Sequence, residues 1–139
     1  YRIDSVQEVH DTGKSLNPLI DLGQMEGGIV QGLGWMTMEE VIHDPHGRLL
    51  TDSLTTYKVP DIHFAPNIKV KFLPATRNPA GPFNSKAIGE PPLLYGIAGY
   101  FAILNAMRAL KPDLMTFDSP MTPEKVLMNL IGHGNTFPE

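Results

Sequence analysis

The spacing of apolar and polar residues predicts two β-strands in separate parts of the chain. Residues 67–73 alternate strictly between the two kinds and form the clearer strand, half-buried with one polar side. Its apolar members are Ile68, Val70 and Phe72. Residues 1–10 also read as a strand, which ends at an Asp-Thr-Gly turn. The apolar members there are Ile3, Val6 and Val9.

Three further segments have the features of helices. An Asn-Pro pair is a favourable start for a helix over residues 18–36. Residues 93–110 are apolar on nearly every side, which predicts a long, buried central helix. A Thr-Pro-Glu sequence begins a short third helix, which a glycine closes, within residues 122–132.

The order of these elements favours a single mixed domain. Residues 39–51 predict a hairpin, because two short segments flank an Asp-Pro-His-Gly turn. Strands and helices follow one another without regular alternation, so we expect an α+β fold with a mixed sheet, a glycine-rich helix and a long buried helix. Its 139 residues fit one domain, residues 1–139.

Glycine is unusually frequent in the helix over residues 18–36. Each interior glycine disfavours the helix by about 0.5–1 kcal/mol relative to alanine. The five are Gly23, Gly27, Gly28, Gly32 and Gly34. We therefore expect close approach of another backbone or of a flat ligand. Gln24, Gly28 and Gln31 share one face that could hydrogen-bond a heterocycle edge, although their spacing alone favours tight helix packing beside two solvated glutamines.

Composition and charge exclude several classes of function. The formal charge is −4 and the basic residues are dispersed, which argues against nucleic-acid binding. Without cysteine the chain forms no disulfide and offers no thiolate to zinc or an iron–sulfur cluster. Its five histidines lack metal-binding spacing, so we expect no metal ligand here. We find no apolar stretch of the roughly 20 residues that a membrane span needs, and expect a cytoplasmic protein.

One carboxylate, at the start of the apolar helix, is the candidate for chemistry. Glu90 lies between Gly89 and two prolines, which we expect to restrict it to extended backbone conformations. A rigidly held, partly buried carboxylate would suit a general base, but a glutamate in a first helical turn is common without that role. Lys86 could pair with Glu90, bind an anion or lie at the surface. Ser85 has no evident base nearby.

Several stretches of the chain together carry a family resemblance. The longest, at residues 84–93, reads NSKAIGEPPL. The others lie at residues 15–18, 21–28, 31–34, 53–60 and 120–124. In order and spacing these stretches resemble the xanthine dehydrogenase and aldehyde oxidase family of molybdenum hydroxylases, and most of all its bacterial xanthine dehydrogenases. The likeness extends over nearly the whole chain.

The resemblance implies an activity that the intact enzyme performs. The chain would be the C-terminal portion of a molybdopterin-binding subunit that hydroxylates a purine such as xanthine or hypoxanthine, with water as the oxygen source, in purine catabolism. Electrons would pass to iron–sulfur clusters, FAD and NAD in other domains or subunits. Because the family's subunit is several times longer, we expect its remainder and the iron–sulfur and FAD parts as partners, and no activity from the isolated chain.

The resemblance also implies roles for individual residues. Glu90 matches the family's general base, and Gln24 matches a glutamine that hydrogen-bonds molybdopterin. Because of that match, we interpret the face formed by Gln24, Gly28 and Gln31 as a cofactor-binding surface. Gly89, Ser85 and Lys86 lie in the same motif as Glu90 and are expected at the cofactor, with weaker support for the last two.

Two alternatives stay open at this point. The substrate could be an aldehyde or another N-heterocycle, because residues outside the chain would select it. The chain could also be a non-catalytic interaction module built on the same scaffold, which would be complete as made in the cell and fold alone with a polar surface.

Overall fold

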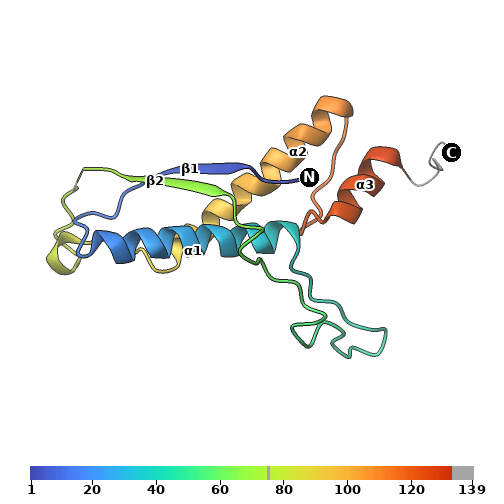
Figure 1. Ribbon diagram of the computed structural model, residues 1–139, viewed down its shortest axis with the longest axis horizontal. Coiled ribbons are helices and arrows are strands. Elements are labelled where there is room, and N and C mark those ends of the chain that lie inside the picture. Colours follow the sequence, from blue (N-terminus) through green and yellow to red (C-terminus); the bar gives the residue numbers. More distant parts are fainter. Residues whose placement is uncertain (75, 133–139) are drawn as a thin grey trace.

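The computed structural model describes residues 1–74 and 76–132, in which strands and helices are mixed as expected (Figure 1). The elements are β1 Ser5–His10, α1 Pro18–Thr37, β2 Asn67–Phe72, the 3-10 helices η1 Pro82–Asn84 and η2 Pro91–Gly96, α2 Ile97–Leu110 and α3 Pro123–Ile131. Asn17 caps α1 by accepting a hydrogen bond from the Ile20 amide, and Thr122 caps α3 in the same way. The α+β class and the three predicted helices are confirmed.

The sheet has two strands, and within the described ranges it is parallel rather than mixed. β1 pairs with β2 in a register that runs from Ser5↔Asn67 to His10↔Phe72. Parallel pairing follows from the crossover, because α1 carries the chain back between the two strands. The hairpin predicted at residues 39–51 is reduced to one antiparallel bridge, and this connection extends away from the helices (Figure 1).

The residues on the inward face of β1 are not all the apolar ones that its sequence pattern indicates. Burial alternates along the strand, so Val6, Glu8 and His10 face inward while Val9 is 57% exposed. Val6 and Val9 are three residues apart, and an odd spacing puts two residues on opposite faces of a strand. As a result, a histidine that is only 8% exposed occupies the end of the strand.

α1 and η2 approach each other through glycines. A Cβ atom on Gly32 would overlap the carbonyl oxygen of Leu93, and one on Gly96 would overlap the Gly32 backbone. One turn earlier, a Cβ on Gly28 would lie 2.7 Å from Pro92 Cβ. Backbone-to-backbone contact is therefore the physical reason for glycine at these positions of the helix.

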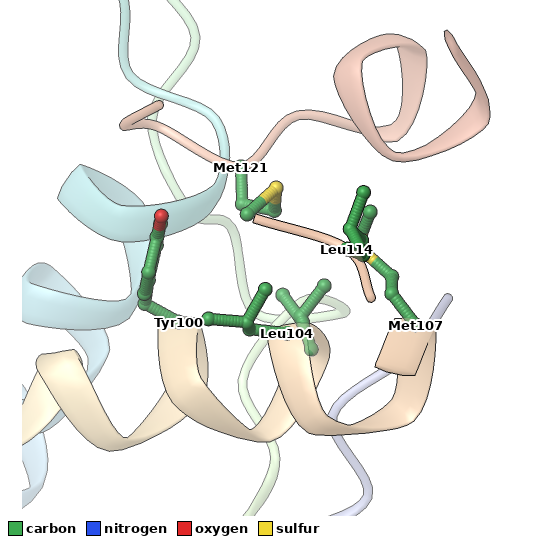
Figure 2. Close-up of a cluster of buried hydrophobic side chains, with 6 residues drawn as sticks. Tyr100, Leu104, Met107, Leu114 and Met121 are labelled. Carbon is green, nitrogen blue, oxygen red and sulfur yellow. The ribbon is translucent and has the colours of Figure 1, made fainter. Parts of the chain in front are cut away.

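One hydrophobic core fills the space between α2 and the segment that follows it (Figure 2). Its buried residues are Tyr100, Ile103, Leu104, Met107, Leu114 and Met121. α1 adds a second buried row at helical spacing, made of Met25, Ile29 and Leu33. Tyr1 joins the two parts, since its hydroxyl lies 2.6 Å from the Met121 carbonyl and 3.1 Å from the carbonyl of Thr37, the last residue of α1.

α2 is buried on one face, so the prediction of burial on nearly every side is wrong for the chain as described. Leu94, Ile97 and Phe101 are 72%, 54% and 47% exposed. The segment Pro91–Leu110 is also long and apolar enough, by length and composition, to cross a membrane, which corrects the expectation that no stretch qualifies. Its buried face nevertheless forms the core, which is how a helix packs in a folded domain.

The glycine contacts predict opposite effects for two alanine substitutions in α1. Gly32→Ala should destabilise the fold by about 1–3 kcal/mol, because the new methyl group meets rigid backbone that cannot rotate away. Gly27→Ala should stabilise it by about 0.5–1 kcal/mol, because open space surrounds that position and alanine favours the helix. Denaturant unfolding measures both, and equal effects of the two substitutions would contradict the packing assigned to Gly32.

Candidate functional site

Glu90 precedes η2 as its N-cap residue and is exposed rather than partly buried. Its backbone is helical, with φ −109° and ψ −28°, so the prediction of an extended conformation is wrong. The Leu93 amide donates to the Glu90 carbonyl at 3.0 Å, and this closing turn outweighs the steric preference of a residue before proline. The Glu90 carboxylate accepts no hydrogen bond from residues 1–74 or 76–132.

Gln24 lies beside the Gly89–Glu90 segment, although 65 positions separate it from Gly89 in the sequence. A Cβ atom on Gly89 would lie 3.9 Å from Gln24 Oε1 and would meet nothing nearer. The Gln24 amide is exposed and makes no hydrogen bond to the part of the chain that the structure describes. Gly89, the residue before Glu90, is therefore a spatial neighbour of this amide.

Gln24, Gly28 and Gln31 share one face of α1, but Gly28 is not open to a ligand. Pro92 covers Gly28, which stands between Gln24 and Gln31 on α1. The tight-packing interpretation is thus confirmed at Gly28, and Gln24 is the glutamine that lies beside Gly89. An open cavity of about 500 Å³ adjoins that base. Its lining residues are Ala87, Gly89, Glu90, Pro91, Leu93 and Leu94.

Ser85 and Lys86 bind protein groups near the start of the motif. The Ser85 hydroxyl donates to the Pro82 carbonyl at 2.7 Å. Lys86 Nζ lies 2.5 Å from Asp11 Oδ2, so Lys86 pairs with Asp11 and not with Glu90. Its backbone amide also donates to the Thr12 carbonyl at 2.8 Å. Both residues thus fasten the segment that leads to Glu90.

Asp11 collects hydrogen bonds from three segments of the chain. Besides Lys86, Thr76 Oγ1 donates to Asp11 Oδ1 at 2.7 Å and the Gly13 amide donates to it at 2.8 Å. The Lys86 ammonium, followed by the Thr76 and Gly13 donors, holds the pKa of the Asp11 carboxyl well below its usual range. The carboxylate therefore joins the end of β1 and the segment after β2 to the motif.

His10, next to Asp11, contacts the other flank of Glu90. His10 Nδ1 and the Tyr95 hydroxyl lie 2.5 Å apart, and the two rings meet edge to face at 5.7 Å. Burial, and after it the charge of Glu8, raises the pKa of the Tyr95 phenol, so the hydroxyl keeps its proton. His10 Nε2 is buried and has no hydrogen-bond partner in the described structure.

Sequence reasoning missed His10, Asp11 and Tyr95 as parts of this site. The sequence places Asp11 in a turn and Tyr95 within the helix predicted over residues 93–110, and it indicates no further role for either. A strict period of two from Val6 would have placed His10 on the inner face of β1, but no local pattern connects it to Tyr95. Among residues 1–74 and 76–132, no group of three or more His, Cys, Asp and Glu residues could hold a metal ion.

Comparison with known proteins places this geometry in a family context. The molybdopterin cofactor-binding domain family matches residues 1–66. The chain is 44% identical to xanthine dehydrogenase/oxidase of Rattus norvegicus over 85% of its length, and 39% identical to aldehyde oxidase 1 of Bos taurus over 86%. The crystal structure of quinoline 2-oxidoreductase from Pseudomonas putida 86 superimposes on 93% of the chain with a TM-score of 0.84 and 32% identity.

These matches cover small parts of much longer proteins. The chain spans 10% of the rat protein, 9% of the bovine protein and 16% of the quinoline 2-oxidoreductase chain. The two strands, the glycine-rich α1 and the Glu90 segment thus correspond to one portion of a larger scaffold.

The Asp11 contacts predict a pH dependence of stability. Because the pKa of Asp11 is lower in the folded chain than in the unfolded chain, its contribution is present above about pH 4 and is lost as the pH falls below that value. Asp11→Asn should therefore flatten the decrease of the unfolding midpoint between about pH 4 and pH 2. Asp52→Asn, which removes the same formal charge from an exposed position, should keep the original slope.

Proposed function

Because the chain belongs to the xanthine dehydrogenase and aldehyde oxidase family of molybdenum hydroxylases, we propose that it carries the general base of such an enzyme, Glu90. The reaction is the oxidative hydroxylation of an electron-poor carbon with water as the source of oxygen. The chain spans about a tenth of its relatives, so this activity belongs to the intact enzyme, and the isolated chain is inactive.

The observation that carries this proposal is the juxtaposition of Gln24 and the Gly89–Glu90 segment. A Cβ on Gly89 would lie 3.9 Å from Gln24 Oε1, and Glu90 is the next residue. The Gln24 amide and the Glu90 carboxylate are both exposed, and neither has a hydrogen-bond partner among the described residues. Buried or paired groups would be unable to serve a ligand, whereas Glu90 lines the open cavity beside η2 and the exposed Gln24 amide lies next to Gly89, another of its lining residues. This donor set fits the polar edge of a pterin beside a basic carboxylate.

The roles of the residues follow from their chemistry. The Gln24 amide has both a donor and an acceptor, so it can hydrogen-bond the pterin of the molybdenum cofactor. Gly89 lies beside that amide and places no side chain next to it. A carboxylate oxygen of Glu90 accepts the proton that water-derived oxygen loses as it attacks the substrate carbon. The molybdenum cofactor, when bound, supplies the redox centre for the electron pair of the substrate.

Ser85 and Lys86 take a different part from the one expected at the cofactor. Their side chains bind the Pro82 carbonyl and the Asp11 carboxylate. A lysine engaged in a 2.5 Å ion pair is held away from a second anion. We therefore assign both residues to holding the motif in place.

The substrate we propose first is a purine such as xanthine or hypoxanthine, in the purine catabolism of the cytoplasm. A relative named xanthine dehydrogenase/oxidase and one named aldehyde oxidase 1 match the chain at similar identity. We propose that the side chains that discriminate the two substrates lie in the rest of the enzyme, and an aldehyde is the second candidate. Electrons leave through iron–sulfur and FAD groups to NAD in other domains or subunits.

The uncovered face of η2 and α2 supports the remainder of the molybdenum subunit as the partner. Leu94, Ile97 and Phe101 form an exposed apolar row directly after Glu90. Burying a row of this kind against protein is favourable by about 25 cal/mol per Å² of apolar surface. A neighbour on that row would also enclose the cavity beside Glu90 and exclude water from it.

Replacing the proposed base tests the function. In the full-length enzyme Glu90→Gln should lower kcat by about 10²–10⁴-fold, because the amide cannot accept the proton, while bound molybdenum stays unchanged. Steady-state kinetics and metal analysis measure the two quantities. Glu124→Gln changes a glutamate in the first turn of α3 and should leave both unchanged. Full turnover by the Glu90→Gln enzyme would contradict the proposal.

Replacing the proposed pterin ligand tests cofactor binding separately. Gln24→Leu removes a hydrogen bond worth about 1 kcal/mol and should lower the equilibrium retention of the cofactor about fivefold. The matched control is Gln31→Leu, an exposed glutamine two turns further along α1. Molybdenum and pterin content after dialysis is the measurement, and equal content in both variants would refute the role of Gln24.

A further inference from the structure

We propose that His10 and Asp11, adjacent at the end of β1, form a clamp that holds both flanks of the Glu90 segment and so positions its carboxylate. The consequence for turnover rests on the function proposed for Glu90, but the clamp itself is a property of the fold. His10 and Asp11 are positioning residues, since neither side chain contacts Glu90.

The first arm of the clamp runs from Asp11 to Lys86, four residues before Glu90. The ion pair measures 2.5 Å, and the two side chains are 31% and 37% exposed. The Lys86 amide is fastened too, by its 2.8 Å hydrogen bond to the carbonyl of Thr12. Side-chain and backbone contacts therefore fix the same residue to the end of the strand.

The second arm runs from His10 to Tyr95, five residues after Glu90 within η2. The hydrogen bond between His10 Nδ1 and the Tyr95 hydroxyl is 2.5 Å long and partly buried. The edge-to-face ring contact, with an interplanar angle of 82°, adds a geometric constraint. The last residue of β1 and the residue after it thus reach both ends of a ten-residue segment.

The segment needs such external support because Glu90 has little of its own. Its side chain accepts no hydrogen bond from the described residues, and the one turn that it closes is the 3.0 Å bond from the Leu93 amide. β1, in contrast, is held along its length by the ladder to β2. The hydrogen bonds between β1 and β2 fix the position of β1, and the clamp holds η2 relative to it.

The unpartnered nitrogen of His10 points to a positioning role rather than to stability. A buried polar atom without a partner disfavours the folded state, and an apolar side chain of similar shape would avoid this loss. Packing alone would therefore be served better by leucine or phenylalanine at position 10. Among the described residues, the contact with Tyr95 is the one that His10 Nδ1 makes and that an apolar side chain could not make.

Removing one hydroxyl tests the clamp in the intact holoenzyme. Tyr95→Phe keeps the ring and deletes the bond to His10, and it should lower kcat about tenfold while KM changes by less than about twofold. Hydrogen–deuterium exchange at the Leu93 to Gly96 amides should accelerate severalfold. The matched control is Tyr100→Phe, which deletes a hydroxyl bond to the Thr116 carbonyl in the segment after α2 and should leave both readouts unchanged.

A double substitution separates positioning from stability. His10→Leu together with Tyr95→Phe removes both polar partners, so the unfolding midpoint should return to that of the original enzyme while kcat stays low and exchange stays fast. Recovery of kcat together with stability would show a merely structural role and overturn the clamp. Unchanged exchange in Tyr95→Phe would overturn it as well.

The outcome for Glu90 is independent of this test. If Glu90→Gln keeps full turnover, the proposed function fails, yet the exchange measurement still decides whether the clamp holds the segment. If Glu90→Gln is inactive and Tyr95→Phe changes neither kcat nor exchange, the proposed function stands and the clamp is wrong.

Discussion

The backbone contact between α1 and η2 is the constraint on which the site depends. Gly28 and Gly32, one turn apart, let η2 lie directly on the helix, where Pro92 and Leu93 occupy the space that side chains would need. Gln24 is one turn before Gly28 on the same face, so it faces the residues just before Pro92. The distance from the Gln24 amide to the Glu90 segment is thus set by backbone sterics rather than by hydrogen bonds.

Much of the fold could be predicted from the sequence, because its signals are local. The Asn17 cap, the glycine-rich helix and the strict alternation of residues 67–73 each lie within one element and each correspond to an observed element. It was harder to predict which residues of each element are buried. Apolar residues mark β1 at an irregular spacing, and the period of two that the sheet imposes turns Val9 outward and His10 inward. α2 looks buried on every side because its outer face is apolar and uncovered within this chain.

The site, like the fold, has parts that the sequence predicts and parts that it does not. The prediction of Glu90 came mainly from a motif, since a glutamate before a proline has no catalytic meaning by itself. The sequence predicts an extended backbone at Glu90, but the backbone is helical, because a turn closed by Leu93 overrides a local steric preference. His10 and Tyr95 are separated by 85 positions in the sequence, and Asp11 and Lys86 by 75. Such pairs arise from the crossover that places β1 beside the motif, and single-residue patterns do not contain that information.

Hydrogen bonding separates the groups proposed to act from the groups that hold them. Ser85, Lys86 and Tyr95 each have a protein partner, whereas Gln24 and Glu90 have none among the described residues and are exposed. A carboxylate that must take up a proton cannot be fixed by strong donors of its own, since these would stabilise its charged form and weaken it as a base. Precision must then come from the backbone on either side. The glycine contact on α1 and the fastened flanks of η2 provide that precision without touching the carboxylate.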